Sequence, residues 1–316
     1  MKIGFIPKDE RDKRFFLPVF KEKNIDLSLM NRNGFWIEYG NTLKAGYFER
    51  SEDFSEFIKT KNKIKIIDKN ILDLDLIFMR AYNPPYAEYP YSKEYLDFLF
   101  DVCKIMELEG YPVINPVNSI YIARKKYLTY YLLQKEGIKI PLTFSTHDPV
   151  RAFFSLKDIG FPIVFKPADG AGGVGIVITD DKSTAGDLTS LYGGYYRVPI
   201  LQKYIENPGR DIRVLVIGSE VIGAIYRIQN KGIKKSGISS GGTPKEFKPD
   251  AELEELALKC SQIIGCKIAG IDVIENKEDY IVLEINASPA FEGFMQATNK
   301  NIPEIIVHYL MDEAKC

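Results

Sequence analysis

Short apolar runs alternate with segments of helix length in the N-terminal part of the chain, and few folds accommodate that pattern. The runs are KIGFIP (residues 2–7), DLIFMR (75–80) and YPVINP (111–116). Buried strands separated by helices are typical of a parallel sheet whose faces are covered by those helices. Between Ser92 and Gly110, apolar residues recur at helical spacing, which fits one covering helix. We therefore expect an open α/β domain first.

The pattern changes after Gly160. Two helices are predicted before that point, one over residues 119–136 and one that runs from Asp148 as N-cap, with Pro149 in its first turn, to Gly160. Beyond it, apolar runs follow one another through tight turns, namely FPIVFKP, VGIVIT, RVPILQKYI, DIRVLVIG and EVIGAIYRI. One further helix is predicted over residues 250–265. The predicted fold class is α/β followed by an antiparallel α+β region.

The composition argues against several classes of partner. The 316 residues include 42 basic and 43 acidic side chains, a net charge of -1, so no overall field attracts nucleic acid or an anionic membrane. No apolar stretch approaches the roughly 20 residues that cross a bilayer. The start MKIGFIPKDERDKR does not resemble a secretion signal, so we expect a cytoplasmic protein. The 4 cysteines form no CxxC pair and are expected to be reduced.

A glycine-rich segment, FKPADGAGGVGIVI (residues 165–178), follows one of the predicted strands. Lys166 ends the strand, and the glycines after it lack Cβ atoms, so their backbone amides could wrap closely around phosphate oxygens. A simple glycine-rich hairpin is the alternative. The segment is not a Walker loop, because GK[ST] is absent, and not a dinucleotide fingerprint, because a strand follows it.

Oxygen-bearing side chains interrupt two apolar strands near the C-terminal end. Glu284 and Asn286 in YIVLEINA share one face of a strand, and Asp272 lies in the preceding strand AGIDVIE. Burying an uncompensated carboxylate costs on the order of several kcal/mol. Magnesium, which prefers oxygen ligands, would compensate it. Ion pairs with nearby lysine or arginine are the alternative.

Three further charged residues have weaker signals. Lys126 lies on a predicted helix, where a lysine judged alone is most often a solvated surface charge. Asp211 and Arg213 alternate onto one face of a strand. An arginine bounded by apolar residues usually pairs with a carboxylate or a phosphate, and Asp211 is one candidate for such a pair.

In chain order, five segments resemble the successive motifs of ATP-grasp carboxylate-amine ligases. They are NPVNSIYIARKKYLTYYLLQKEGIKIP, VFKPADGAGGVGIVI, LQKYIENPGRDIRVLVIG, AGIDVI and LEINASPAFEGF. The last is similar to the RimK-type α-L-glutamate ligases, whose members add glutamate to a protein terminus or a cofactor tail. The resemblance implies a pre-ATP-grasp α/β domain at 1–115 and an ATP-grasp domain at 116–316. Within the latter it implies a lid subdomain at about 140–205 and a C-terminal subdomain at about 206–316.

The resemblance also implies a role for each matching residue. Residues 202–205 would meet adenine, Asp211 would take the ribose, and the glycine loop would close over the phosphates. The implied ATP-binding residues are Lys126, Lys166, Gly170, Ala171, Gly172, Gly173, Gly175, Gln202, Lys203, Tyr204, Ile205, Asp211 and Ser236. The implied ligands of two Mg²⁺ or Mn²⁺ ions are Asp272, Glu284 and Asn286. Arg213, at the transferred phosphate and acyl oxygen, and Lys235 are the implied catalytic residues.

The implied reaction phosphorylates a substrate carboxylate with ATP and lets an amine, that of L-glutamate by resemblance, displace the phosphate. Its partners would be a small-molecule or peptide carboxylate and an amino acid. Alternatives are a D-alanine:D-alanine, glutathione or lysine-biosynthesis type of ligase, and a non-catalytic ATP-binding regulatory module. A homodimer is the commonest assembly for such chains.

Two departures from the family pattern concern the substrate side. KKSGISSGG (residues 234–242) replaces a stretch that in RimK-type relatives commonly reads Arg-Ser-Asn, and Gly237 removes the asparagine. Lys203 stands where many relatives have glutamate. The identity of the carboxylate substrate and the roles of residues 234–245 and of the Tyr/Pro-rich stretch 80–92 stay open.

Overall fold

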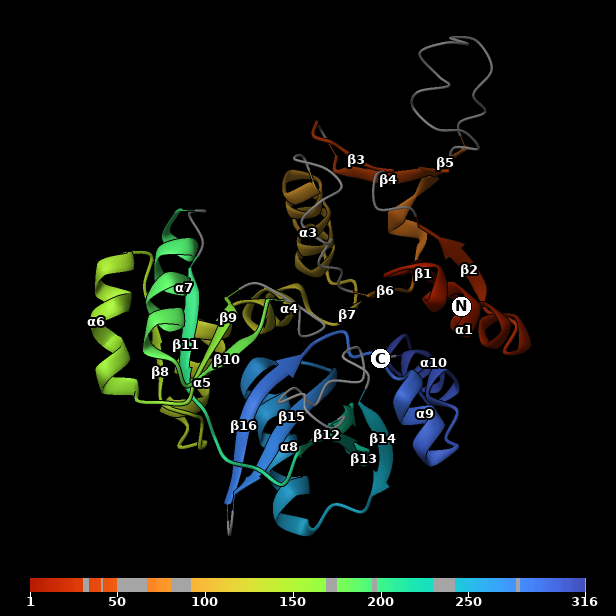
Figure 1. Ribbon diagram of the computed structural model, residues 1–316. Coiled ribbons are helices and arrows are strands. Elements are labelled where there is room, and N and C mark those ends of the chain that lie inside the picture. The colour runs from red at the N-terminus through yellow and green to blue at the C-terminus, as the bar shows by residue number, and fades with distance from the viewer. Residues whose placement is uncertain are drawn as a thin grey trace. The chain divides into compact units, whose positions relative to one another are not determined.

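The computed structural model describes residues 1–30, 34–40, 42–49, 67–80, 92–168, 175–194, 198–229, 242–276 and 279–315 (Figure 1). They form two compact units, Met1–Val117 with Asn301–Cys316 and Asn118–Lys300. The sequence placed residues 301–316 in the second domain, whereas in the structure they group with the first unit. The division into a pre-ATP-grasp and an ATP-grasp domain stays a prediction.

The first unit is built on a parallel sheet in the order β2-β1-β6-β7. Its strands are β1 (Lys2–Ile6), β2 (Asp26–Leu29), β6 (Leu76–Met79) and β7 (Val113–Ile114). Three of them coincide with the apolar runs, so the predicted open α/β arrangement is confirmed. Within the described residues, the α-helices of this unit are α1 (Glu10–Glu22), α3 (Ser92–Leu108) and α10 (Ile302–Glu313).

Aromatic rings form the centre of this unit. The ring of Phe5 on β1 lies 5.4 Å from that of Phe16 on α1 and 5.3 Å from that of Phe78 on β6, measured between centroids. A buried ion pair lies beside them, with Arg80 Nε 3.1 Å from Asp12 Oδ2. In such a pair each charge is compensated by the other, so the pair does not indicate a ligand-binding site.

Sequence analysis did not predict α1 or a second sheet in this unit. The second sheet is antiparallel, in the order β3-β4-β5, with bounds Phe35–Glu38, Lys44–Glu49 and Ile67–Asn70. A short 3-10 helix, η1 (Ile71–Asp73), follows it. Helix α1 is hard to predict because its sequence is highly charged and contains Pro18. Asp9 nevertheless caps it.

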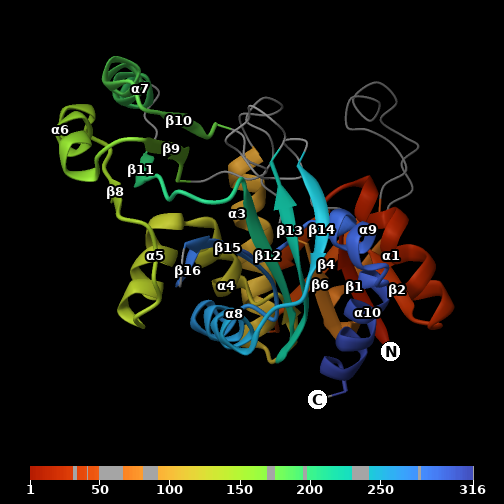
Figure 2. The same cartoon turned by 60° about the horizontal axis from the view of Figure 1, so that its bottom comes forward.

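The second unit contains a four-stranded antiparallel sheet in the order β10-β9-β11-β8. The strands are β8 (Thr143–Ser145), β9 (Ile163–Pro167), β10 (Val177–Thr179) and β11 (Pro199–Lys203). Helices α6 (Pro149–Ile159) and α7 (Lys182–Gly194) lie side by side against it (Figures 1 and 2). The caps of α6 at Asp148 and Gly160 are as predicted.

A five-stranded antiparallel sheet in the order β14-β13-β12-β15-β16 forms the rest of the second unit. Its strands are β12 (Arg210–Ile217), β13 (Glu220–Ile228), β14 (Thr243–Phe247), β15 (Ile268–Asn276) and β16 (Asp279–Asn286). Helix α8 (Ala251–Ile264) packs along this sheet (Figure 2). Asp250 caps it and Gly265 ends it, as predicted. Helix α9 (Glu292–Thr298) follows β16.

The prediction of one helix over residues 119–136 is wrong. The structure has two helices, α4 (Val117–Arg124) and α5 (Lys126–Lys135). Lys125 separates them, because its φ of -101° and ψ of 82° are not helical. As a result Lys126 is the first residue of α5 rather than a mid-helix residue.

Two stretches with open roles fall largely outside the described residues, 81–91 and 230–241. Across the ranges that the structure does describe, no helix combines the length and the apolar character needed to span a bilayer.

Candidate active site

Three oxygen-bearing side chains gather at one end of the β15–β16 pair. Glu284 lies directly opposite Asp272 in the register of the two strands, and Asn286 lies opposite Gly270. Nδ2 of Asn286 is 3.5 Å from Oδ2 of Asp272, and Asp272 is 5% exposed. The structure thus brings together the two side chains that the sequence placed on one face of β16 and the Asp272 side chain of the preceding strand.

A β-bulge sets this geometry. The strand partners jump from Asp272 with Glu284 to Val273 with Val282, so Leu283 has no partner on β15. A bulge redirects the side chains next to it. The carbonyl oxygen of Leu283 instead accepts a hydrogen bond from the hydroxyl of Tyr130 on α5 at 2.8 Å.

Arginines compensate the buried carboxylates from neighbouring strands. Arg213 on β12 donates from Nε and Nη2 to the two oxygens of Asp272 at 2.7 and 2.6 Å. Arg227 on β13 donates to Asp211 at 2.7 and 2.6 Å, and its Nη2 is 3.0 Å from Oδ2 of Asp272. Burial alone would raise the pKa of Asp272, but the two guanidinium groups hold it below its ordinary value.

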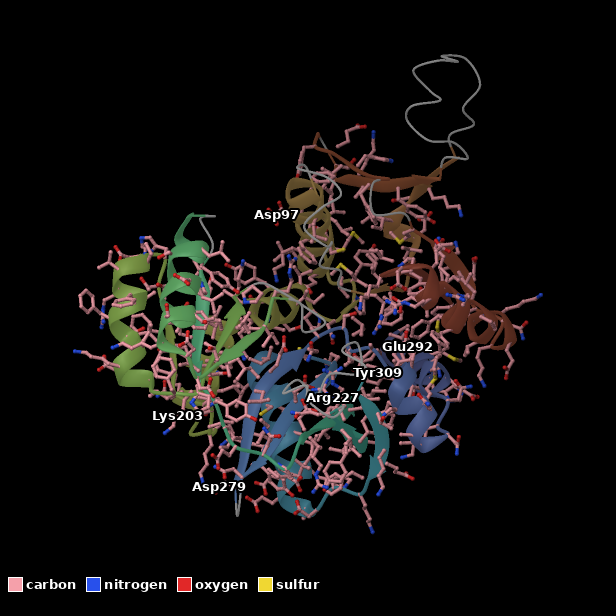
Figure 3. All side chains as sticks on the ribbon, in the orientation of Figure 1. Asp97, Lys203, Arg227, Asp279, Glu292 and Tyr309 are labelled. Carbon is pink, nitrogen blue, oxygen red and sulfur yellow. The ribbon has the colours of Figure 1, made fainter. Side chains whose placement is uncertain are left out.

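Sequence reasoning missed Arg227, which Figure 3 labels among the side chains of the five-stranded sheet. The signal was present, because Arg227 interrupts the run EVIGAIYRI as Arg213 interrupts DIRVLVIG. Which arginine pairs with which acid could not be predicted from the sequence. The sequence allowed Asp211 as the partner of Arg213, whereas the register places Asp211 opposite Arg227 and Arg213 opposite Asp272. The alternative of ion-paired acids therefore describes this sheet.

Lys126 lies against the same acids. It is 6% exposed, and its Nζ is 3.1 Å from Oε1 of Glu284. A lysine judged alone on a helix was interpreted as solvated, and that interpretation is wrong. The break at Lys125 starts α5 at this point and leaves Lys126 beside β16.

Lys166 on β9 is buried in a different manner. It is 6% exposed, and its Nζ lies 5.3 Å from the centroid of the Tyr130 ring. Within the described ranges of the chain, its ammonium has no hydrogen-bond or ion-pair partner. Burial lowers the pKa of Lys166 to about 8, against the opposing effect of Glu284 and Asp272.

The end of β11 and the residues that follow it are held largely by backbone hydrogen bonds. The backbone N–H groups of Lys203 and Tyr204 donate to carbonyls of neighbouring segments, and the carbonyl of Ile205 accepts a bond from a side-chain amide. Gln202 is buried, and its Nε2 donates to Oγ1 of Thr143 at 2.8 Å. The side chain of Lys203 is exposed (Figure 3).

This arrangement agrees with what comparison with known proteins finds. A model of the RimK-like ATP-grasp domain matches residues 123–310, which contain every residue of the candidate site described above. The chain belongs to the RimK-like ATP-grasp family. The resemblance that the sequence motifs indicated is confirmed.

Curated relatives of this RimK-like ATP-grasp chain include two ligases. A probable alpha-L-glutamate ligase of Coxiella burnetii is 30% identical over 216 residues, 68% of this chain and 72% of the relative. The glutamate–LysW ligase ArgX of Sulfolobus acidocaldarius is 34% identical over 211 residues, 65% of this chain and 75% of the relative. The chain is accordingly an ATP-dependent C–N ligase of the carboxylate-amine type.

Solved structures support the ATP-grasp fold over the whole chain. The ATP-grasp ligase PsnB, complexed with minimal precursor, Mg and ADP, superposes with a TM-score of 0.71 at 17% identity and covers 99% of this chain and 98% of its own. Members of this class use ATP and a divalent metal ion. The predicted fold class is confirmed.

Several residues that the RimK-like ATP-grasp motifs select lie outside the described ranges. They are Gly170, Ala171, Gly172, Gly173, Lys235 and Ser236. Gly175 is described, and its φ of 77° lies in the left-handed region that glycine adopts at little cost. A Cβ atom there would stand 3.3 Å from Cδ of Pro167, so a larger residue would be strained in two ways.

Proposed function

We propose that this ligase uses magnesium and ATP to convert a substrate carboxylate into an acyl phosphate, which the amine of L-glutamate then attacks. ADP and phosphate would be the other products. Glutamate is supported by the names of both curated relatives, each of which is a glutamate ligase. The carboxylate partner would be a small molecule or a peptide.

The buried ammonium of Lys166 carries this proposal. A charge removed from water is costly unless an opposite charge or a set of hydrogen bonds compensates it. Among the described residues, Lys166 has an aromatic ring and no acid at contact distance. A nucleotide phosphate would supply the missing anion. Lys126, whose Nζ is 3.1 Å from Oε1 of Glu284, would be the second phosphate contact.

The oxygen donors fit a hard divalent cation. Asp272, Glu284 and Asn286 would hold magnesium or manganese, which prefer carboxylate and amide oxygens. Asp272 already accepts hydrogen bonds from Arg213 and contacts Arg227, so a bound ion would take the place of part of this compensation. In the described part of the chain, no cluster of three or more His, Cys, Asp or Glu residues competes as a metal site. A bound ion would supply positive charge against the phosphates.

The remaining proposed roles concern positioning. Residues 202–205 would meet adenine through backbone groups and an apolar wall, Asp211 would take the ribose, and Arg213 would oppose charge on the transferred phosphate. Phosphoryl transfer depends mainly on such alignment and charge neutralisation. Holding the reactants together contributes on the order of 7 to 11 kcal/mol. The four-stranded sheet with α6 and α7 would be the lid subdomain.

A product assay tests the proposal. The protein would be incubated with ATP, magnesium, isotopically labelled glutamate and a panel of carboxylates that includes cofactor precursors, peptides and small carrier proteins. We expect acceptor-dependent ADP release and a product that contains the label by mass spectrometry. Acceptor-dependent ADP release with another amino acid, and none with glutamate, would contradict the assignment of the amine.

A further inference from the structure

Tyr130 on α5 touches both sheets of the second unit. It is 4% exposed, and it packs with Ala168 and Ile200 in a small core cluster. Its ring lies under the ammonium of Lys166, which belongs to the four-stranded sheet. Its hydroxyl donates to the carbonyl of Leu283 in the five-stranded sheet. One side chain therefore has a polar contact on each side.

The position of Tyr130 on α5 joins it to the acid site. Residues four apart on a helix lie on the same side, so Tyr130 and Lys126 share a side of α5. Lys126 contacts Glu284, and Tyr130 contacts Leu283, the residue before it. Two successive residues of β16 thus anchor α5, and the same helix presents an aromatic ring to Lys166.

Among the described residues, the ring is also the contact that the ammonium of Lys166 has in place of an acid. The face of an aromatic ring carries a partial negative charge and attracts a cation within about 6 Å of its centroid. At 5.3 Å the Lys166 ammonium lies inside that range. The attraction directs the ammonium without neutralising it, which leaves its charge available to an incoming anion.

We propose that Tyr130 is a positioning residue for the phosphate-binding lysine. Its hydroxyl fixes the ring to the bulge at Leu283, and the ring holds the ammonium of Lys166 at a set place relative to Glu284. The inference rests on the proposed function of Lys166 and adds a residue that the family motifs did not select. A role in packing alone is the competing explanation, since an aromatic residue also fills space.

A double-mutant cycle separates the two explanations. Tyr130→Leu removes the ring, Tyr130→Phe keeps the ring and removes the hydroxyl, and Lys166→Ala removes the cation. For Tyr130→Leu we expect the dissociation constant for ATP to rise roughly tenfold, which is a loss of about 1.4 kcal/mol of binding free energy. Tyr130→Phe should lose less than about threefold because the ring remains. In the Lys166→Ala background, Tyr130→Leu should cause almost no further loss.

The steady-state constants provide the second readout. Tyr130→Leu should raise KM for ATP more than it lowers kcat, because the acids and arginines of the five-stranded sheet are untouched. Ile140→Val, which trims a side chain packed against the same cluster, is the matched packing control and should leave ATP affinity within about twofold. Melting temperatures identify any variant that fails to fold. In that case Tyr130→Met, whose flexible apolar side chain has no ring and adapts to irregular gaps, takes the place of Tyr130→Leu.

Two outcomes would overturn the inference. One is an equal loss from Tyr130→Leu in the presence and absence of Lys166, and the other is an equal loss from Tyr130→Phe and Tyr130→Leu. The first result would assign Tyr130 to packing, and the second would assign the loss to its hydroxyl rather than to the ring beside Lys166. Unchanged ATP affinity in Lys166→Ala alone is a different result, because it would remove the proposed function of Lys166 itself.

Discussion

The two sheets of the second unit hold buried charge in opposite ways. In the five-stranded sheet, each acid of the site has a cation beside it: Arg213 and Arg227 contact the buried Asp272, and Lys126 contacts the half-buried Glu284. In the four-stranded sheet, the described residues give Lys166 an aromatic ring and no acid. Paired charges are already compensated, whereas an unpaired buried cation stays costly until an anion arrives. The charges of the five-stranded sheet are therefore compensated without a ligand. An anionic ligand should gain the most binding free energy at Lys166 in the four-stranded sheet.

The largest effect should follow from changing the charge of an acid in the five-stranded sheet. We expect Glu284→Gln to lower the rate of ligation by about 100- to 1000-fold, because a proposed metal ligand loses its charge. The fold should persist, since glutamine keeps the shape and can still accept a bond from Lys126. ADP release and thermal melting would measure the two properties.

A matched control lies on the adjacent strand. Glu275→Gln changes a carboxylate of β15 that is bonded to Arg210 and Tyr226 and has no proposed role in catalysis. It should leave turnover within about threefold. An active Glu284→Gln protein at low magnesium would refute the assignment of Glu284 to the metal.

The next effect concerns stability. Arg227→Met would leave Asp211 without its paired cation and Asp272 with Arg213 alone. Removing one partner of a buried ion pair costs about 3 to 5 kcal/mol, so the free energy of unfolding measured with urea should fall by that order. Arg80→Met, which removes the ion-pair partner of Asp12 in the first unit, should lower the free energy of unfolding by a similar amount. A shift for Arg80→Met with none for Arg227→Met would show that the five-stranded sheet does not depend on its arginine.

The opposite sign is expected in the four-stranded sheet. Lys166→Met removes a buried cation for which the described part of the chain offers no acid partner, so the free energy of unfolding should stay equal or rise in the absence of nucleotide. The affinity for ATP should fall about tenfold to a hundredfold, because a charge-assisted phosphate contact is lost. Calorimetry and urea titration of the same sample would test both signs. Lys157→Ala on α6, where the side chain is exposed, is the control. A loss of stability together with unchanged ATP affinity would contradict the comparison.

The smallest effect is expected at the buried thiols, which avoid charge altogether. Burial raises the pKa of Cys103, Cys260 and Cys266 to about 12. They should therefore stay protonated at mildly alkaline pH and resist alkylation in both units. Mass spectrometry should find their peptides labelled only after denaturation. Labelling of a native thiol in one unit would show that this unit opens more readily.

Local signals in the sequence were sufficient for many elements. Asp148, Gly160, Asp250 and Gly265 mark helix ends because capping depends on neighbouring residues alone. The helix α7 was missed, since KSTAGDLTSLYGG has weak apolar periodicity and contains Gly186. The break at Lys125 was missed because nothing in ARKKYLT disfavours a helix. These differences arise from packing, which overrides weak propensity.

The candidate site was predictable in its residue types and less so in its pairing. Alternation along β16 put Glu284 and Asn286 on one face, but which arginine meets which acid depends on strand register. The sequence also could not place α10 in the first unit, where Glu304 pairs with Lys23 at 2.9 Å. Such contacts join residues far apart in the chain and leave no local pattern.

The bulge at Leu283 has a consequence for the inheritance of this site. Strand alternation reverses at the bulge, so deletion or insertion of a single residue in β16 would turn Glu284 away from Asp272. The same slip would carry the carbonyl of Leu283 away from Tyr130. The hydrogen bond from α5 to Leu283 therefore forms only when β16 has the correct register. We expect this site to tolerate point substitutions better than changes in the length of β16.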